Sequence, residues 1–330
     1  MAEFITSRDV LVGDTADVYF ARTIEILKKE GLNPVTTMEV FASRAGILCG
    51  IEEVKALLST ALSNIKGEVW SLHEGEAMER KEVVLRITAP YQSFGLYETA
   101  ICGILAHCSG WATAARECVE VAGDIPVISF GARHVHPSVV AVMDYSAIIG
   151  GCQSCSSISG ARLAAIEPSG TIPHALVLVM GDTVAATLAF DKHMPPNVPR
   201  ISLVDTFKDE AEESLRVAQA LDKSLDSVRL DTPRERGGVT VALVRELRAR
   251  LDFAGFNHVK IFVSGGLNME RIRQFIEKGV PVDGFGVGSY ITSASPIDFT
   301  ADIHEIEGKP VAKRGRIPGK TLNSRLKQLI

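Results

Sequence analysis

The chain has 330 residues, of which 46% are hydrophobic and 23% are charged, as in an ordinary globular protein. This length is enough for a large core and predicts more than one domain. The net charge of -5 gives no sign of a nucleic-acid-binding surface, and no apolar run reaches the roughly eighteen residues of a membrane span. We therefore expect neither a nucleic-acid partner nor a membrane span.

The cysteines and the N-terminus predict a cytoplasmic protein. The first residues, MAEFITSRDV, lack the basic-then-apolar order of a signal peptide. Six cysteines are spread along the chain without regular spacing, which suits a reducing compartment. Cys152 and Cys155 have the spacing of half a zinc site, but no second pair matches them. We interpret these two as packing residues.

The first third of the chain predicts a small domain of helices and strands. The predicted elements are a helix at 14–29, a strand at 36–41, an amphipathic helix at 51–65, short strands within 69–88, and a helical stretch at 94–121. The last of these is expected to be a helix pair, or one helix bent at Ser109-Gly110.

From residue 124 onward, short apolar runs alternate with segments of helical period. The runs are 126–130, 147–150, 164–166, 201–204, 228–230, 261–263 and 282–287, and the clearest helical segments are 210–221, 239–251 and 268–277. Such alternation predicts a parallel sheet. Small or charged groups follow most of the runs, as around the active site of a β/α barrel.

The C-terminal segment is expected to complete the first domain. Strand-like 303–306 and 311–312 bracket a turn at Gly308-Lys309. We predict an α/β protein with a discontinuous N-terminal α/β domain, 1–122 with 295–330, and a β/α barrel catalytic domain, 123–294.

Asp231 is a candidate ligand for a sugar. It directly follows the run 228–230, and a carboxylate can accept hydrogen bonds from both hydroxyls of a ribose. The alternative is a helix N-cap or a turn residue.

Two glycine loops, Gly265-Gly266 and Gly286 with Gly288, are candidate phosphate sites. Their backbone amides can approach a phosphate closely, and the last strands of a barrel favour such sites. The alternative is that they are only tight turns between strand and helix.

Two further candidates are cationic. Arg133, His134 and His136 form a dense cluster just past a strand, which suits an anionic ligand better than a metal. His174 precedes an apolar run, where a lone histidine is more often structural.

A series of motifs then points to a family. They are Asp17-Val-Tyr19, Ile87-Thr-Ala-Pro-Tyr91, Leu96-Tyr-Glu-Thr99, Ser109-Gly-Trp-Ala-Thr113, Phe130-Gly-Ala-Arg-His134, Gly170-Thr171 with His174, Leu203-Val-Asp-Thr-Phe207, Arg229-Leu-Asp231, Ser264-Gly-Gly266, Gly286-Val-Gly-Ser289 and Gly308-Lys-Pro-Val-Ala-Lys-Arg-Gly315. In number and order they resemble nicotinate phosphoribosyltransferases of the type II phosphoribosyltransferase superfamily, which also contains the nicotinamide and quinolinate enzymes.

The resemblance implies a reaction and its partners. Nicotinate and phosphoribosyl pyrophosphate would give nicotinate mononucleotide and pyrophosphate, coupled to ATP hydrolysis, with Mg²⁺ as cofactor and a homodimer whose active sites share residues. No residue is assigned as a metal ligand. The quinolinate branch carries an additional histidine-arginine pair that this chain lacks.

The resemblance also implies roles for residues. Tyr19 would stack on the pyridine ring, Arg133 would pair with the nicotinate carboxylate or a phosphate, and His174 would take a phosphoryl group from ATP. His174, Arg229 and Asp231 are the expected catalytic residues. The expected substrate-binding residues are Asp17, Tyr19, Arg133, Thr171, Asp205, Ser264, Gly265, Gly266, Gly286, Gly288 and Ser289.

Three other functions remain open from the sequence. The nearest is another type II phosphoribosyltransferase, acting on nicotinamide or quinolinate. A non-catalytic phosphoribosyl- or nucleotide-binding barrel is the second, but the retained candidates Arg229, Asp231 and His174 disfavour it. A sugar-phosphate aldolase or isomerase is the third, and it would need a lysine at a strand end, which these runs do not offer.

Overall fold

The computed structural model describes residues 4–330, and the chain forms two compact units. Unit 1 comprises the chain up to Ala114, residues 163–165 and residues 294–330; unit 2 comprises residues 115–162 and 166–293. The sequence places the domain boundaries at 122/123 and 294/295. The first observed boundary falls earlier, inside helix α4 (Glu98–Ala122), which runs from one unit into the other.

Unit 1 is built on a six-stranded sheet of order β13-β12-β1-β5-β3-β14. The strands are β1 (Val35–Ala42), β3 (Glu68–Ser71), β5 (Val83–Pro90), β12 (Phe299–Ile306), β13 (Lys309–Pro310) and β14 (Lys327–Gln328), and a separate pair is formed by β2 (Gly46–Ile47) and β4 (Ala77–Met78). β12 pairs antiparallel with β1, and β14 with β3. The C-terminal segment therefore returns to the sheet of unit 1.

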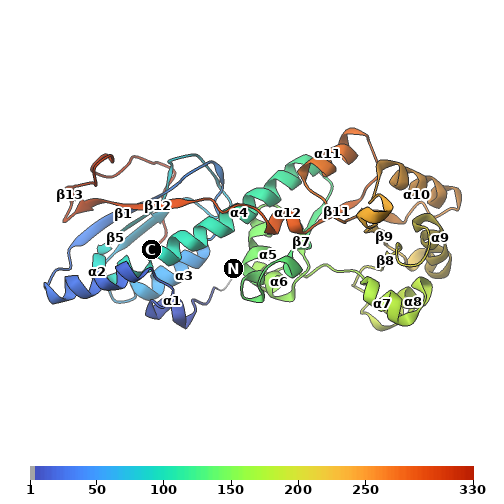
Figure 1. Cartoon of the computed structure of the whole chain (residues 1–330), viewed down its shortest axis with the longest axis horizontal. Helices are drawn as coiled ribbons and strands as arrows, with labels where there is room; N and C mark the ends of the chain where they lie inside the picture. Colours follow the sequence, from blue (N-terminus) through green and yellow to red (C-terminus); the bar gives the residue numbers. More distant parts are fainter. Residues whose placement is uncertain (1–3) are drawn as a thin grey trace. The chain divides into compact units, whose positions relative to one another are not determined.

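Four helices accompany this sheet, namely α1 (Arg8–Val12), α2 (Val18–Lys29), α3 (Ile51–Ala61) and the first part of α4. In Figure 1, α3 and α4 lie along the strands β1, β5 and β12. The apolar stripe predicted for α3 is buried at Ile51, Val54, Leu57 and Leu58, where it shares a core with residues of β1 and β5. Burial of such a stripe, more than intrinsic propensity, holds a helix in place.

The helix pair expected over 94–121 is wrong, since α4 is one continuous helix of 25 residues. Gly110 has a packing role within it. A Cβ at Gly110 would lie 2.8 Å from the carbonyl oxygen of Ser295, so the missing side chain lets two segments of unit 1 approach closely.

Unit 2 contains six parallel strands in the order β7-β6-β11-β10-β9-β8. They are β6 (Val127–Ser129), β7 (Ser154–Cys155), β8 (Ile201–Leu203), β9 (Ser227–Leu230), β10 (Lys260–Val263) and β11 (Gly284–Val287). Within the described residues, β7 and β8 form the two edges and do not pair. The predicted α/β fold class is confirmed, with the barrel present as an open half-barrel of parallel strands.

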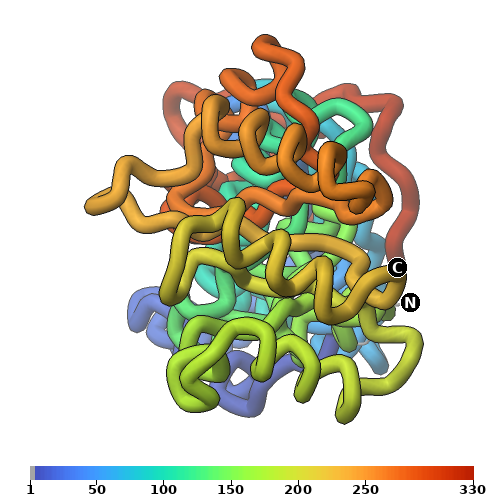
Figure 2. Tube along the Cα trace, turned by 90° about the vertical axis from the view of Figure 1, so that its right-hand side faces the viewer, coloured from blue at the N-terminus to red at the C-terminus, as the bar shows by residue number. Residues whose placement is uncertain are grey.

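The helices of unit 2 connect these strands. They are α5 (Val140–Ile149), α6 (Ile158–Ala164), α7 (His174–Met180), α8 (Thr183–His193), α9 (Glu210–Leu221), α10 (Val241–Phe253), α11 (Met269–Glu277) and α12 (Ser289–Thr292). Figure 2 shows the yellow-green to orange helices, α7 to α11, following one another in chain order. The helices predicted at 210–221, 239–251 and 268–277 are confirmed within two residues.

Two predicted strands are wrong. Residues 147–150 form the end of α5 and its C-cap. Ala164 is the last residue of α6, and the chain turns at Ala165, which has a positive φ of 55°. Short apolar runs of this kind do not distinguish a buried strand from a buried helix turn. The strand in this region is β7, a two-residue segment without a hydrophobic signal of its own.

No single helix within residues 4–330 has the length and apolar composition needed to cross a membrane, although α7 and α8, bent by 108°, meet those criteria when taken together.

Candidate active site

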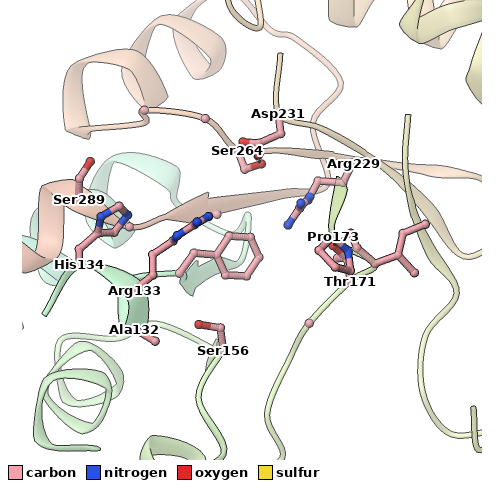
Figure 3. Close-up of a pocket in the computed structure, with 17 residues that line it drawn as sticks. Ala132, Arg133, His134, Ser156, Thr171, Pro173, Arg229, Asp231, Ser264 and Ser289 are labelled. Atoms are coloured by element: carbon pink, nitrogen blue, oxygen red, sulfur yellow. Dashed lines mark hydrogen bonds between the residues drawn. The ribbon is translucent and has the colours of Figure 1, made fainter. Parts of the chain in front are cut away.

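A cavity of about 560 Å³ lies in unit 2 where the strands β6, β7, β9, β10 and β11 end (Figure 3). In a parallel sheet the carboxyl ends of all strands share one edge, so residues far apart in the sequence meet there. The lining residues are Phe130, Ala132, Arg133, His134, Ser156, Gly170, Thr171, Ile172, Pro173, Arg229, Asp231, Ser264, Gly265, Gly266, Gly286, Gly288 and Ser289.

Asp231 is held in one orientation by its neighbours. The Ser264 hydroxyl donates to Asp231 Oδ1 at 2.9 Å, and the backbone N–H of Asp231 donates to Asp205 Oδ2 at 3.1 Å. The side chain of Asp231 remains 31% exposed. A fixed carboxylate that is still open to the cavity can accept hydrogen bonds from a bound hydroxyl pair.

His174 lies beside this carboxylate at the start of α7. Its Nδ1 is 2.9 Å from the Thr206 hydroxyl, and its Nε2 is 3.7 Å from Asp205 Oδ1 and 3.8 Å from Asp231 Oδ2. Asp205 is 1% exposed, and its Oδ1 has no hydrogen-bond partner among the described residues. Burial raises the pKa of Asp205, His174 opposes that shift, and Asp231 adds to it.

Arg229 reaches the cavity from β9 against the ring of Phe130, with its Cζ 5.6 Å from the ring centroid. Its buried Nε has no hydrogen-bond partner among the described residues. Burial lowers the pKa of Arg229, and the carboxylates of Asp231 and Asp205 oppose that change. A guanidinium stays protonated in proteins, so Arg229 keeps a positive charge at the cavity.

Arg133 contributes a second cation from a 3₁₀ turn (Ala132–His134) that follows β6. Its side chain makes no hydrogen bond or ion pair with the rest of residues 4–330. Figure 3 shows Arg133 and Arg229 entering the cavity from different sides, with Asp231 and Ser264 together at a third. Among residues 4–330, one carboxylate and two guanidinium groups line the cavity, and no lysine does.

The loop at Gly265-Gly266 has the backbone of an anion-binding turn. Both glycines have positive φ, 88° and 63°, which other residues rarely adopt. The amide groups of Gly265 and Gly266 have no hydrogen-bond acceptor among the described residues. Successive free amides of this kind form a concave site for phosphate oxygens.

The second glycine loop serves a different purpose at Gly286. A Cβ there would lie 2.4 Å from a ring carbon of Phe130, and one at Gly288 would lie 2.9 Å from the Phe130 carbonyl oxygen. These glycines therefore let the Phe130 segment pack against β11 and keep its ring at the cavity wall.

Most of the residues predicted from the sequence are brought together here. Ten line the cavity, namely Arg133, Thr171, Arg229, Asp231, Ser264, Gly265, Gly266, Gly286, Gly288 and Ser289, while His174 and Asp205 contact Asp231. Asp17 and Tyr19 lie in unit 1, at a separate cavity with Glu98 and Lys313. There the Tyr19 hydroxyl donates to Asp17 Oδ2 at 3.0 Å, which raises the pKa of Tyr19.

Among the residues at the site that were not predicted from the sequence, three have side chains that shape it. Phe130 forms a wall, Ser156 lines the cavity after β7, and Thr206 fixes the ring of His174. Phe130 and Thr206 belong to the motifs that contain Arg133 and Asp205. Their nearness in sequence to these two predicted site residues could have indicated that they also belong to the site. Ser156 follows the strand that the sequence did not reveal.

The described residues contain no group of three or more His, Cys, Asp or Glu side chains arranged to hold a metal. Asp205 Oδ1, buried and without a hydrogen-bond partner, and Asp231 Oδ2 nevertheless offer oxygen ligands of the type that Mg²⁺ prefers. Magnesium typically uses one or two carboxylates together with the phosphates of a substrate. The arrangement therefore fits a magnesium ion that arrives with a phosphorylated ligand.

The comparisons with known proteins cover almost the whole chain. The family model described as "Quinolinate phosphoribosyl transferase, N-terminal domain" matches residues 17–109, and the corresponding C-terminal domain matches residues 111–302. A crystal structure titled nicotinate-nucleotide pyrophosphorylase from Pyrococcus furiosus is 42% identical, with a TM-score of 0.88 over 97% of this chain and 82% of that one.

Curated relatives carry two different names. Nicotinate phosphoribosyltransferase pncB2 of Mycobacterium tuberculosis is 32% identical over 231 residues, which are 69% of this chain and 49% of that protein. The human nicotinate-nucleotide pyrophosphorylase [carboxylating] is 26% identical over 278 residues, 83% of this chain and 84% of that protein. The chain spans about half the length of the curated nicotinate phosphoribosyltransferases that it matches. By the match of both domains, the chain belongs to the quinolinate phosphoribosyl transferase family, within the type II phosphoribosyltransferases.

Proposed function

We propose that the protein is a nicotinate phosphoribosyltransferase, which forms nicotinate mononucleotide and pyrophosphate from nicotinate and phosphoribosyl pyrophosphate in NAD synthesis. One observation carries the proposal: a single cavity combines a fixed carboxylate at Asp231, free amides at Gly265-Gly266 and two guanidinium groups. These groups match the three parts of the reactants, which are the ribose diol, the phosphates and a carboxylate-bearing ring.

The chemistry follows from these placements. The bond between ribose C1 and pyrophosphate breaks, and its electron pair leaves with the pyrophosphate. The lone pair of the pyridine nitrogen then forms the new bond to C1. Because positive charge develops on the ribose and negative charge on the leaving group, fixed charges account for most of the catalysis. Asp231 would hold the ribose hydroxyls, while Arg229 and Arg133 would bind pyrophosphate or the carboxylate of the base.

Magnesium, accompanying the pyrophosphate, would neutralise part of its charge. Asp205 and Asp231 are the residues that would hold the ion. Asp205 Oδ1 and Asp231 Oδ2 both lie within 3.8 Å of His174 Nε2, so the two oxygens converge on one point. Without a cation, two carboxylates at this point would repel a phosphate.

The coupling to ATP rests on His174. In the tautomer that carries its proton on Nδ1, next to the Thr206 hydroxyl, the Nε2 lone pair would attack the γ-phosphorus of ATP, releasing ADP as the phosphorus–oxygen bond breaks. The phosphohistidine would place negative charge beside the cavity and change its affinity for the donor and for pyrophosphate. Hydrolysis of the phosphoryl group would complete the cycle.

Quinolinate is the second candidate base, since the family description and the relatives named nicotinate-nucleotide pyrophosphorylase favour it. Quinolinate has one more carboxylate than nicotinate. Only Arg133, His134 and Arg229 line the cavity as basic residues, which supports the base with a single carboxylate.

Thermal unfolding with each base in the presence of phosphoribosyl pyrophosphate tests the choice. We expect nicotinate to raise the midpoint and quinolinate to leave it unchanged, because a ligand stabilises only the state that binds it. Stabilisation by quinolinate alone would assign the protein to the other reaction.

A further inference from the structure

A second cavity, of about 350 Å³, lies wholly within unit 1, and none of its lining residues is assigned to the proposed reaction. It is bounded by β1, by the turn before β5, and by the segment that follows β13. Its lining residues are Phe41, Lys81, Val83, His304, Gly315, Arg316, Ile317, Pro318, Gly319, Lys320 and Thr321, and we call it the tail pocket.

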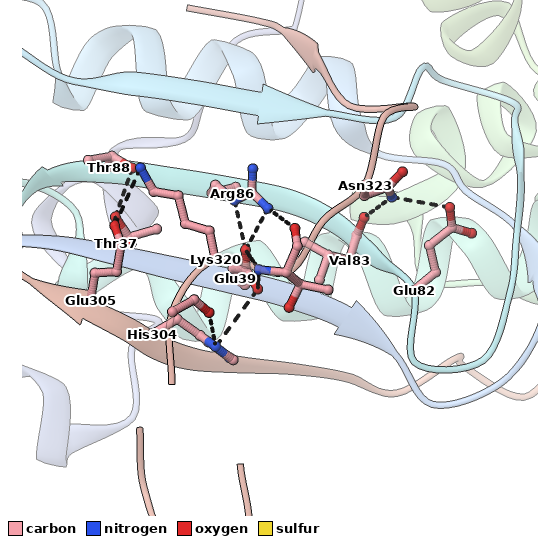
Figure 4. A network of polar contacts seen from close by, with 12 residues as sticks. Thr37, Glu39, Glu82, Val83, Arg86, Thr88, His304, Glu305, Lys320 and Asn323 are labelled. Carbon is pink, nitrogen blue, oxygen red and sulfur yellow. Dashed lines mark hydrogen bonds and ion pairs between the residues drawn. The ribbon is translucent and has the colours of Figure 1, made fainter. Parts of the chain in front are cut away.

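The wall formed by residues 315–321 is fixed by a buried ion pair (Figure 4). Glu39 is fully buried in β1 and accepts hydrogen bonds from Arg86 Nε at 2.7 Å and from the Thr321 backbone N–H at 3.1 Å. Arg86 in turn donates to the Thr321 carbonyl oxygen. These bonds hold the segment against the sheet, so the tail pocket is a built feature with defined walls.

His304 supplies an unused polar atom at this pocket. Its side chain is 7% exposed, and its Nδ1 lies 3.1 Å from the Gly319 carbonyl oxygen, which can only accept. Nδ1 therefore carries a proton, and Nε2 is left buried with no hydrogen-bond partner among the described residues. A buried polar atom without a partner costs about 1–3 kcal/mol, and such atoms are rare in native proteins. This atom lies buried at the wall of the tail pocket.

The charge of the lining indicates the sign of that ligand. Lys81, Arg316 and Lys320 line the pocket, and no acidic residue does. Lys81 Nζ lies 5.6 Å and Arg316 Cζ 5.1 Å from the centroid of the Phe41 ring, so two cations share one aromatic surface.

The carboxylates nearby are already engaged. Asp302 pairs with Lys313 and Arg316, and Glu305 pairs with Lys320. Glu39 is satisfied by Arg86 and Thr321. Lys81 has no carboxylate partner among the described residues, and positive charge is left in excess at the pocket.

Apolar groups form the rest of the wall. Phe41, Val83, Ile317 and Pro318 face the same space, whose volume exceeds that of a bare phosphate ion. An apolar wall with a cationic rim suits an organic anion better than an inorganic one. A phosphate ester supplies the acceptor oxygens that lysine and arginine bind most strongly.

We propose that the tail pocket is a binding site for a small organic phosphate, held by Lys81, Arg316 and Lys320 beside the ring of His304.

The test uses the full chain with ¹³C-labelled histidine and follows the His304 ring signal by NMR. The probes are adenosine monophosphate and orthophosphate, and the His304→Gln variant assigns the signal. This reporter lies in the tail pocket, so binding to the cavity of unit 2 does not substitute for it. We expect saturable shifts with both probes and tighter binding of adenosine monophosphate.

Lys81→Gln is the decisive variant, because Lys81 is exposed and its loss leaves the core intact. It should weaken binding at least about tenfold, the effect of losing one charged contact. Lys66→Gln, an exposed lysine of the same unit outside the pocket, is the matched control and should bind like the parent protein. Absence of a saturable shift at His304, or equal losses in the two lysine variants, would overturn the proposal. Equal affinity for both probes would contradict an organic ligand.

Discussion

The Ser264 hydroxyl bridges two strand ends, donating to Asp231 Oδ1 at 2.9 Å while lying 3.1 Å from the Leu230 carbonyl oxygen. This contact fixes one oxygen of the Asp231 carboxylate and leaves the other, Oδ2, 3.8 Å from His174 Nε2. Asp231 follows β9, but its carboxylate is oriented by Ser264, which follows β10. Its orientation is the feature on which the proposed catalysis most depends.

Asp231→Ala should lower kcat/KM at least about a hundredfold, because the ribose hydroxyls lose the group that positions them. The fold should survive, since Asp231 is partly exposed and Ser264 keeps its contact with Leu230. Steady-state kinetics and a thermal melt provide the measurement. Asp124→Ala, an exposed acid of the same unit, is the control. Near-normal turnover in the Asp231 variant would show that another group holds the ribose.

His174 should become labelled when the protein is incubated with γ-³²P-labelled ATP, and the label should be acid-labile, as a phosphohistidine is. Thr206→Val should reduce the labelling, because it removes the hydroxyl that fixes Nδ1. Peptide mapping identifies the site. If no label reaches His174 and turnover is independent of ATP, the residue serves only in binding.

A shared active site in a homodimer is tested by mixing subunits. We expect Tyr19→Ala and Asp231→Ala to be nearly inactive alone and to recover about a quarter of the parent activity together. Hybrid dimers form in the mixture, and one of their two sites contains both native residues while the other contains neither. A two-fold dimer with shared sites therefore recovers part of the activity. Subunit exchange must be verified by mass spectrometry. Exchange without recovery would place Tyr19 and Asp231 in independent roles.

Glu53 predicts a pH dependence of stability in unit 1. Burial, and next the charge of Glu74, raise the pKa of Glu53 from 4.5 to about 7. The folded state therefore favours protonated Glu53. The stabilisation that comes from this preference is complete below about pH 4.5 and is lost as the pH rises toward 7. The free energy of unfolding should fall by about 2 kcal/mol between these values.

Glu53→Gln should remove most of that dependence and stabilise the protein above pH 7, as measured by denaturant unfolding across pH. Glu30→Gln, an exposed glutamate of the same unit, should leave the dependence unchanged. An identical pH profile in the Glu53 variant and the parent would contradict the assignment.

The elements that could be predicted from the sequence are those in which apolar residues repeat with a regular period over several turns. Helix α9 (Glu210–Leu221) begins and ends where its apolar period does, because Asp209 caps its N-terminus and the buried face runs its full length. Short elements were not predictable. The run at 147–150 belongs to a helix whose residues are buried on most sides, and such a run carries no period.

The site was predictable as a set of strand-end residues, since a parallel sheet brings them to one edge. The sequence did not reveal which neighbours orient them. The hydroxyl that fixes His174 comes from Thr206, 32 positions away. The ring that needs Gly286 belongs to Phe130, on a neighbouring strand end. Contacts of this kind depend on register and rotamer, which local pattern does not encode.

One assay of product formation distinguishes the proposed reaction from the quinolinate reaction. Purified protein is given phosphoribosyl pyrophosphate and Mg²⁺ with either nicotinate or quinolinate, with and without ATP, and the nucleotide and released carbon dioxide are quantified. We expect nicotinate mononucleotide from nicotinate, stimulated by ATP, with no carbon dioxide from quinolinate. Nucleotide formed only from quinolinate, with equal release of carbon dioxide and no effect of ATP, would contradict it.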